Sequence, residues 1–131
     1  MTRFLFAFLL IATPALPTER IISVEEFEAI SRGQTQIFER DGEFFGAEQF
    51  FSNRQTLWMF RNGQCDRGTW YPVEDLICFQ YETLPEAQCW YMIERDGSYF
   101  ARLQGAEPQF DLELVDITRE DLPCPGPEVG S

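Results

Sequence analysis

The stretch CFQYETLPEAQCW, residues 78–90, decides the fold because it contains two candidate strands joined by a polar connection. Two cysteines and three aromatic residues flank this connection, which is centred on Pro85. Successive side chains of a strand point to opposite faces of a sheet. In LICFQYE, residues 76–82, and in CWYMIER, residues 89–95, both sets of alternating positions contain apolar side chains. We therefore expect an antiparallel pair that is covered by another element or lines a cavity.

Short strands separated by turn signals extend from this pair in both directions. Asp-Gly at 41–42, Asn-Gly at 62–63 and Asp-Gly at 96–97 favour tight hairpin turns. Eight strands are expected, at residues 35–40, 43–51, 55–61, 64–71, 75–82, 89–95, 98–104 and 108–117. We predict a mainly β fold, either an antiparallel meander or a lipocalin-like small barrel of about eight strands, with one short N-terminal helix. A strongly curled open sheet is the alternative.

The predicted helix lies before the first of these strands, in SVEEFEAI, residues 23–30. Ser23 is a favourable N-cap, and Glu26 stands at the position of its capping-box partner. Val24, Phe27 and Ile30 recur at helical spacing and form one apolar stripe. We expect this stripe to pack against the sheet.

The N-terminal sequence MTRFLFAFLLIATPALP has the order of a secretory signal peptide. Arg3 is followed by an unbroken apolar run at residues 4–12, and small residues precede a cleavage site predicted after Ala15. The run is shorter than the roughly 20 residues that cross a bilayer. We predict a signal peptide at 1–15, a single β-rich domain at 16–131 with a Pro-rich C-terminal tail, and a periplasmic or secreted location without stable membrane insertion.

Cys65, Cys78, Cys89 and Cys124 all lie in the predicted exported part. An even number of cysteines in an oxidising compartment predicts two disulfides, with three possible connectivities. A tight turn around Pro85 would separate Cys78 from Cys89 by roughly 10–13 Å along the strand, beyond the span of a disulfide, so this bond would require a wide or bulged turn. We therefore favour bonds that reach outside this hairpin, with Cys124 tying the tail to the sheet. The chain has no histidine, which excludes a mixed Cys/His metal site, and no metal site is predicted.

The charge and composition exclude several classes of function. Without the predicted signal peptide the chain has 9 basic and 22 acidic residues, a balance that disfavours binding to nucleic acid or to an anionic membrane surface. Because all basic residues are arginines and histidine is absent, neither a Ser-His-Asp triad nor a lysine Schiff base can form. We expect a protein without enzymatic activity and without a cofactor.

Aromatic residues on consecutive strands are the candidate ligand-binding residues. They are Trp58, Trp70, Phe79, Tyr81 and Trp90. In a small barrel they would form a concave surface for one small apolar or aromatic ligand. The favoured alternative is that the same side chains simply fill the barrel.

A protein-interaction module is the alternative function, as an inhibitor or an envelope-assembly accessory. Its surface would be a loop or an edge strand that contacts an envelope protein. The candidate loop is EQFFSNRQ, residues 48–55, in which Phe50 and Phe51 precede a polar tip.

The middle of the chain carries a pattern of the form GxEQF…W…GxCxxGxW…ICFxYE…CW. Its positions are Gly46, Glu48, Gln49, Phe50, Trp58, Gly63, Cys65, Gly68, Trp70, Ile77, Cys78, Phe79, Tyr81, Glu82, Cys89 and Trp90. In this pattern the chain resembles a family of small exported proteins of Gram-negative bacteria. The resemblance covers about a third of the chain. It implies a shared fold and carries no assigned activity.

Overall fold

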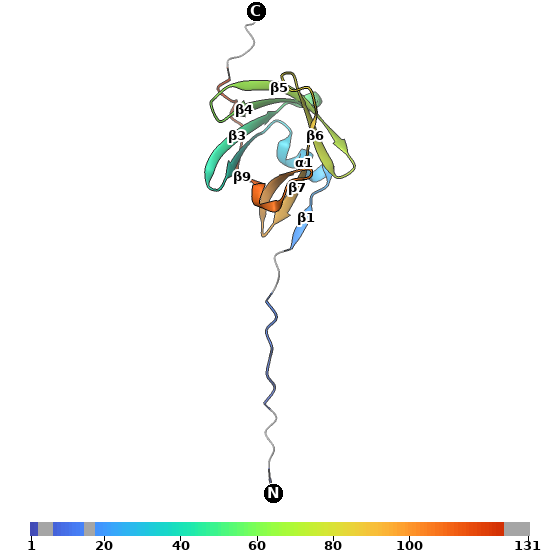
Figure 1. Ribbon diagram of the computed structural model, residues 1–131, viewed down its shortest axis with the longest axis vertical. Helices are drawn as coiled ribbons and strands as arrows, with labels where there is room; N and C mark the ends of the chain where they lie inside the picture. Colours follow the sequence, from blue (N-terminus) through green and yellow to red (C-terminus); the bar gives the residue numbers. More distant parts are fainter. Residues whose placement is uncertain (3–6, 15–17, 125–131) are drawn as a thin grey trace, which may run out of the picture.

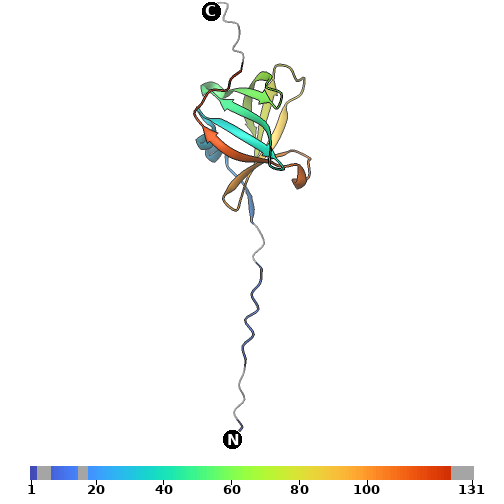
Figure 2. The same cartoon turned by 90° about the vertical axis from the view of Figure 1, so that its left-hand side faces the viewer.

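Eight consecutive strands close into an antiparallel barrel in a computed structural model, which describes residues 1–2, 7–14 and 18–124 (Figures 1 and 2). The strands are β2 (Thr35–Arg40), β3 (Glu43–Phe50), β4 (Gln55–Phe60), β5 (Cys65–Val73), β6 (Leu76–Tyr81), β7 (Gln88–Arg95), β8 (Ser98–Leu103) and β9 (Leu112–Thr118). Each strand pairs with the next in sequence, and β9 pairs with β2 to close the barrel. The structure therefore confirms the mainly β fold, as the closed barrel and not as an open sheet.

Local turn chemistry explains two of the hairpins, β2–β3 and β7–β8. Asp41 and Gly42 have φ angles of 51° and 78°, and Asp96 and Gly97 repeat this pattern with 51° and 82°. Positive φ at both central residues is the geometry of turns that match the twist of paired strands. The β5–β6 turn has no such dipeptide, and Glu74 takes the positive φ there. The sequence indicated the end of β5 too early, because Pro72 was interpreted as a strand end, whereas β5 continues through Pro72 to Val73.

Helix α1 (Val24–Ser31) begins as the sequence predicts, because Ser23 Oγ accepts a hydrogen bond of 3.1 Å from the backbone N–H of Glu26. The helix lies across one end of the barrel (Figure 1). Phe27 is only 1% exposed, and its ring packs edge-on against Phe50 and Trp70. The predicted apolar stripe is therefore part of the barrel core.

A short first strand, β1 (Glu19–Ile21), was not predicted from the sequence. It pairs antiparallel with the end of β7, where Arg20 lies opposite Glu94. Arg20 also forms ion pairs with Glu26 and Glu94. All three residues of β1 are exposed, so no alternation of apolar and polar residues marks them as a strand.

The disulfides are Cys65–Cys124 and Cys78–Cys89. The first confirms that Cys124 ties the C-terminal segment to the sheet. The second lies within the hairpin, so the prediction that the bonds reach outside it was wrong. Cys78 and Cys89 are direct cross-strand partners, because the connection spans residues 80–87 and is not a tight turn around Pro85. In this connection the end of β6 continues to pair with β5, which widens the loop.

The described N-terminal residues do not join the barrel. Residues 7–14 form neither helix nor strand, and Phe8 is 94% exposed. The predicted cleavage site, part of the predicted signal peptide and the end of the Pro-rich tail lie outside the described residues. Within the described part of the chain, no helix has the length and apolar character needed to cross a membrane. The two disulfides indicate an oxidising, non-cytoplasmic compartment.

Candidate functional site

The barrel interior contains a cavity of about 620 Å³. Its lining comes from α1 and from every barrel strand except β5, and the lining is mainly apolar and rich in aromatic residues. The aromatic members are Phe27, Phe38, Phe45, Phe50, Trp58, Phe60, Phe79, Tyr81 and Trp90. Because Phe27 of α1 lines the cavity, one end of the cavity lies beneath the helix. The other end is the mouth, defined here by Arg40, Phe60, Arg61, Asn62 and Leu103, which lie at strand ends and turns on the side away from α1.

The structure brings four of the five predicted ligand-binding residues together. Trp58, Phe79, Tyr81 and Trp90 all line the cavity. Trp70 does not, although it is buried. Its ring packs against Phe27 at 5.0 Å between centroids, and the guanidinium of Arg54 lies 4.7 Å from its centroid. Trp70 therefore belongs to the packing between the helix and the barrel wall.

Two glycines on the inner face of the barrel make room for aromatic rings. A Cβ atom at Gly46 would overlap the Trp58 ring. A Cβ atom at Gly68 would lie 2.8 Å from Cδ1 of Tyr81. Real Cβ atoms do not approach neighbours so closely, so both rings lie directly against the barrel wall. The centre of the barrel is left open as a result.

An acidic side chain, Glu48, lies among these rings and is only 2% exposed. Its Oε1 accepts a hydrogen bond of 2.8 Å from the hydroxyl of Tyr81. Its Oε2 is buried and has no close, well-aligned hydrogen-bond donor among the described residues; the Thr56 hydroxyl is the nearby group that hydrogen-bonds this carboxyl more weakly. On the neighbouring strand Gln36 lies directly opposite Glu48 and is fully buried.

Gln36 presents a second acceptor to the cavity. Its Nε2 donates to the carbonyl oxygen of Ile30 at 3.0 Å and to Oγ of Ser31 at 2.9 Å. Its Oε1 is buried without a hydrogen-bond partner in the described part of the chain. Buried polar atoms usually have partners, so two unpartnered acceptors on neighbouring strands are unusual.

Burial determines the protonation state of Glu48. Loss of hydration raises the pKa of its carboxyl group to about 8, and the hydrogen bonds with Tyr81 and Thr56 only partly offset this rise. The nearby negative charge of Asp66 raises the pKa of Glu48 further. Asp66 is itself 4% exposed and accepts a hydrogen bond from the Thr83 hydroxyl. At neutral pH the Glu48 carboxyl is therefore mostly protonated.

Sequence reasoning missed Glu48 and Gln36 as candidate site residues. The signal was present, because Glu48 has the same strand parity as Gly46 and Phe50, and Gln36 has the parity of Phe38. Polar residues on an otherwise apolar face are candidates for a buried site. The candidate residues were chosen as aromatic residues on consecutive strands, a criterion that leaves out Glu48 and Gln36.

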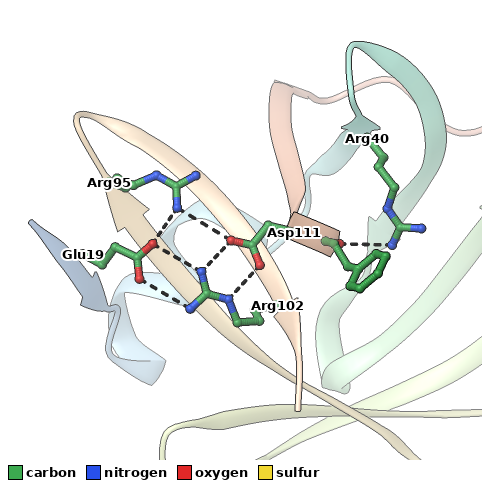
Figure 3. A network of polar contacts seen from close by, with 6 residues as sticks. Glu19, Arg40, Arg95, Arg102 and Asp111 are labelled. Atoms are coloured by element: carbon green, nitrogen blue, oxygen red, sulfur yellow. Dashed lines mark hydrogen bonds and ion pairs between the residues drawn. The ribbon is translucent and has the colours of Figure 1, made fainter. Parts of the chain in front are cut away.

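The two arginines of the cavity lining, Arg40 and Arg61, form contacts with other residues at the mouth. The guanidinium of Arg40 lies 4.6 Å from the centroid of the Phe45 ring, and its Nη2 donates to the carbonyl oxygen of Phe110 (Figure 3). Arg61 pairs with Glu43 at 2.9 Å, and both side chains are largely exposed. Neither arginine is a hydrogen-bond partner of Glu48.

A polar network near the mouth holds β1, β7, β8 and the segment before β9 together (Figure 3). Arg102 donates two hydrogen bonds to Asp111, of 2.7 Å and 2.6 Å. Glu19 accepts from both Arg102 and Arg95. Hydrogen bonds from these two arginines, first Arg102 and then Arg95, lower the pKa of Glu19. The network positions one side of the mouth and does not enter the cavity.

The loop proposed as a partner surface has one buried and one exposed phenylalanine. Phe50 is 2% exposed and belongs to the core, whereas Phe51 is 41% exposed. The following residues form a short 3-10 turn, η1 (Ser52–Arg54), in which Asn53 has a positive φ of 63°. A single exposed phenylalanine is ordinary for a soluble domain.

No protein-family model, curated protein or solved structure matches the chain. The strand order nevertheless places it among closed up-and-down barrels, because every barrel strand neighbours the next one in sequence. Barrels of about eight strands are either filled by side chains or hold one small ligand. The cavity and its lining are therefore the observations that bear on function.

Proposed function

We propose that this protein is a non-enzymatic binding protein that holds one small apolar or aromatic molecule inside its barrel. The observation that carries the proposal is the cavity of about 620 Å³ with its apolar, aromatic-rich lining. Ligand pockets are typically about 300–1,000 Å³ and mostly apolar. Protein interiors otherwise contain few voids larger than a water molecule.

The way the cavity is built supports binding over simple packing. Large voids are costly, because the side chains around them lose packing contacts. Gly46 and Gly68 nevertheless let the Trp58 and Tyr81 rings lie against the wall, where larger residues would push them inward. An apolar guest would restore the missing contacts.

We further propose that the protein acts in the periplasm or after secretion. The disulfides support an oxidising compartment. The exposed apolar residues at 7–14, which have no packing partner in the barrel, support a role as part of a signal peptide. The resemblance to small exported proteins of Gram-negative bacteria agrees with this location.

Tryptophan fluorescence tests the proposal directly, because Trp58 and Trp90 line the cavity. The probe is N-phenyl-1-naphthylamine, which is uncharged at neutral pH and emits strongly in apolar surroundings. We expect saturable binding of one molecule per chain, with energy transfer from tryptophan. Absence of saturable binding, both for this probe and for a panel of apolar and aromatic metabolites, would refute the proposed function.

A matched pair of variants locates the bound probe. Ala101 lines the cavity and is 4% exposed, so Ala101→Trp adds bulk to the interior. Val115 lies on β9 and is 40% exposed, so Val115→Trp adds the same bulk outside. We expect Ala101→Trp to weaken binding by about tenfold or more and Val115→Trp to leave it unchanged. Equal binding by both variants would place the probe elsewhere.

The alternative, a protein-interaction module, has less support. Its strongest observation is the exposed Phe51 beside the η1 turn. One exposed ring offers a small apolar contact, whereas stable protein interfaces bury about 800 Å² on each partner. A stoichiometric protein partner that is captured by the wild-type chain and lost in Phe51→Ser would support this alternative.

A further inference from the structure

The two unpartnered acceptors lie side by side in the cavity. Gln36 and Glu48 are direct cross-strand partners on the inner face of β2 and β3. Side chains at such positions start from Cβ atoms about 4.5–5.5 Å apart. Glu48 Oε2 and Gln36 Oε1 are both buried without partners among the described residues. A single donor group of a ligand would be able to reach both oxygens.

The side chains of Gln36, Tyr81 and Arg40 do not supply that donor. Both donor contacts of Gln36 Nε2 go to α1, and the Tyr81 hydroxyl donates to Glu48 Oε1. Arg40 Nε is also unpartnered, but Arg40 is four residues from Gln36, about 13 Å along β2. Without a ligand, the donors available to these oxygens are the Thr56 hydroxyl and the proton of the Glu48 carboxyl itself, and a ligand donor would replace them.

The charges around Glu48 favour a cationic donor. Asp66 adds a second carboxyl close enough to raise the pKa of Glu48. No arginine of the described residues contributes to the pKa of Glu48. The faces of Trp58 and Tyr81, which line the same cavity, attract cations as well. A cation placed here would meet acidic and aromatic groups and no competing positive charge.

We infer that the cavity selects apolar molecules that carry a positively charged amino group, with the nitrogen held between Glu48 Oε2 and Gln36 Oε1. The apolar body would then occupy the aromatic lining towards the mouth. This inference rests on the proposed function and specifies the chemistry of the ligand.

Binding of such an amine changes the protonation state of Glu48. In the absence of ligand, burial keeps the Glu48 carboxyl protonated at neutral pH. The groups that face it are Gln36 from β2, Thr56 from β4, Asp66 from β5 and Tyr81 from β6, and Arg40 lies at the mouth. When an ammonium group enters, it keeps its three protons and Glu48 releases its own to solvent. Up to one proton is therefore released for each amine bound.

Three probes of equal chain length test the inference by displacement of N-phenyl-1-naphthylamine at neutral pH. Decylamine carries the cation, 1-decanol a neutral donor, and decanoate an anion. We expect decylamine to bind about tenfold or more tightly than 1-decanol, and decanoate to bind most weakly. Similar binding of the amine and the alcohol, or tighter binding of decanoate, would overturn the inference while cavity binding stands.

Glu48→Gln removes the acid and keeps the size of the side chain. We expect this variant to bind decylamine about tenfold more weakly, with its affinity for 1-decanol changed less than about threefold. Glu43→Gln is the matched control, because Glu43 is an exposed acid outside the cavity lining. It should keep the preference for the amine. If Glu48→Gln keeps that preference as well, the inference fails.

Calorimetry on the wild-type chain provides a second test that needs no variant. The heat of decylamine binding should depend on the ionisation enthalpy of the buffer, because a proton is released from Glu48. A buffer-independent heat of binding would overturn the inference. Failure of the probe itself to bind would instead refute the proposed function, so the two failures are distinguishable.

Discussion

Tyr81 donates its hydroxyl hydrogen to Glu48 Oε1 at 2.8 Å, and this contact joins β6 to β3 through the interior of the barrel. The Tyr81 ring reaches inward over Gly68, where a larger residue would collide with it. The carboxyl is thereby held mainly through Oε1, and Oε2 has no comparably close donor among the described residues. The pH dependence of stability and the proposed binding of amines both depend on this Glu48 carboxyl.

The buried acid predicts a pH-dependent stability. Because the pKa of Glu48 is raised to about 8 in the folded chain, folded protein keeps a proton that unfolded protein loses above its ordinary pKa of 4.5. The free energy of unfolding should therefore fall as pH rises from about 4.5 to about 8, by up to about 1.4 kcal/mol per pH unit. Urea unfolding at several pH values measures this slope.

The Glu48→Gln variant isolates this contribution from that of other acids. Its advantage in stability over the wild type should grow as pH rises through the same window and level off above about pH 8. A difference that stays constant with pH would show that Glu48 titrates normally.

The close contact between Gly46 and the Trp58 ring predicts that a larger residue at position 46 lowers the stability of the fold, by an amount that depends on the size of residue 58. Gly46→Ala places a Cβ atom against the Trp58 ring and 2.9 Å from the carbonyl oxygen of Met59. We expect a loss of about 1–3 kcal/mol in the free energy of unfolding. Trp58→Phe removes the outer ring atoms, so the double variant should lose less than the sum of the two single variants. Simple additivity, measured by thermal or urea unfolding, would contradict this account.

The Arg102–Asp111 contact predicts that lysine cannot replace arginine at position 102. Both oxygens of Asp111 accept from Arg102, and both side chains are mostly buried. A lysine cannot form this paired contact, so Arg102→Lys should lower the free energy of unfolding by about 1–3 kcal/mol. Arg61→Lys, at an exposed pair with Glu43, should change it by less than about 0.5 kcal/mol. Equal effects in a urea titration would contradict the prediction.

The Cys65–Cys124 bond predicts protection of the C-terminal segment. Without it, the segment keeps the hydrogen bonds from Thr35 to Glu120 and between Gln49 and residues 121–122. We expect replacement of both cysteines by alanine to speed trypsin cleavage after Arg119 by about tenfold or more. The matched variant without Cys78 and Cys89 should leave this site protected. Cleavage at the same rate in both would show that the bond does not hold the segment.

The strand order was predictable because its signals are local. The Asp-Gly turns at 41–42 and 96–97 impose hairpins through backbone geometry alone, and Ser23 caps the helix by a contact three residues away. The connection around Pro85 was not predictable in the same way. Its width depends on β6 continuing to pair with β5, which is a contact between segments apart in sequence.

The chain's residue order alone determined a disulfide-braced β meander with one capped helix, because alternation, turn dipeptides and caps act over a few residues. Closure of β9 onto β2, the pairing of Cys78 with Cys89 and the joining of Glu48 to Tyr81 were decided only by the tertiary structure. These depend on strand register and barrel curvature, which bring distant residues to one interior. Burial then changes the chemistry of Glu48, an effect that no neighbouring residue in the sequence produces.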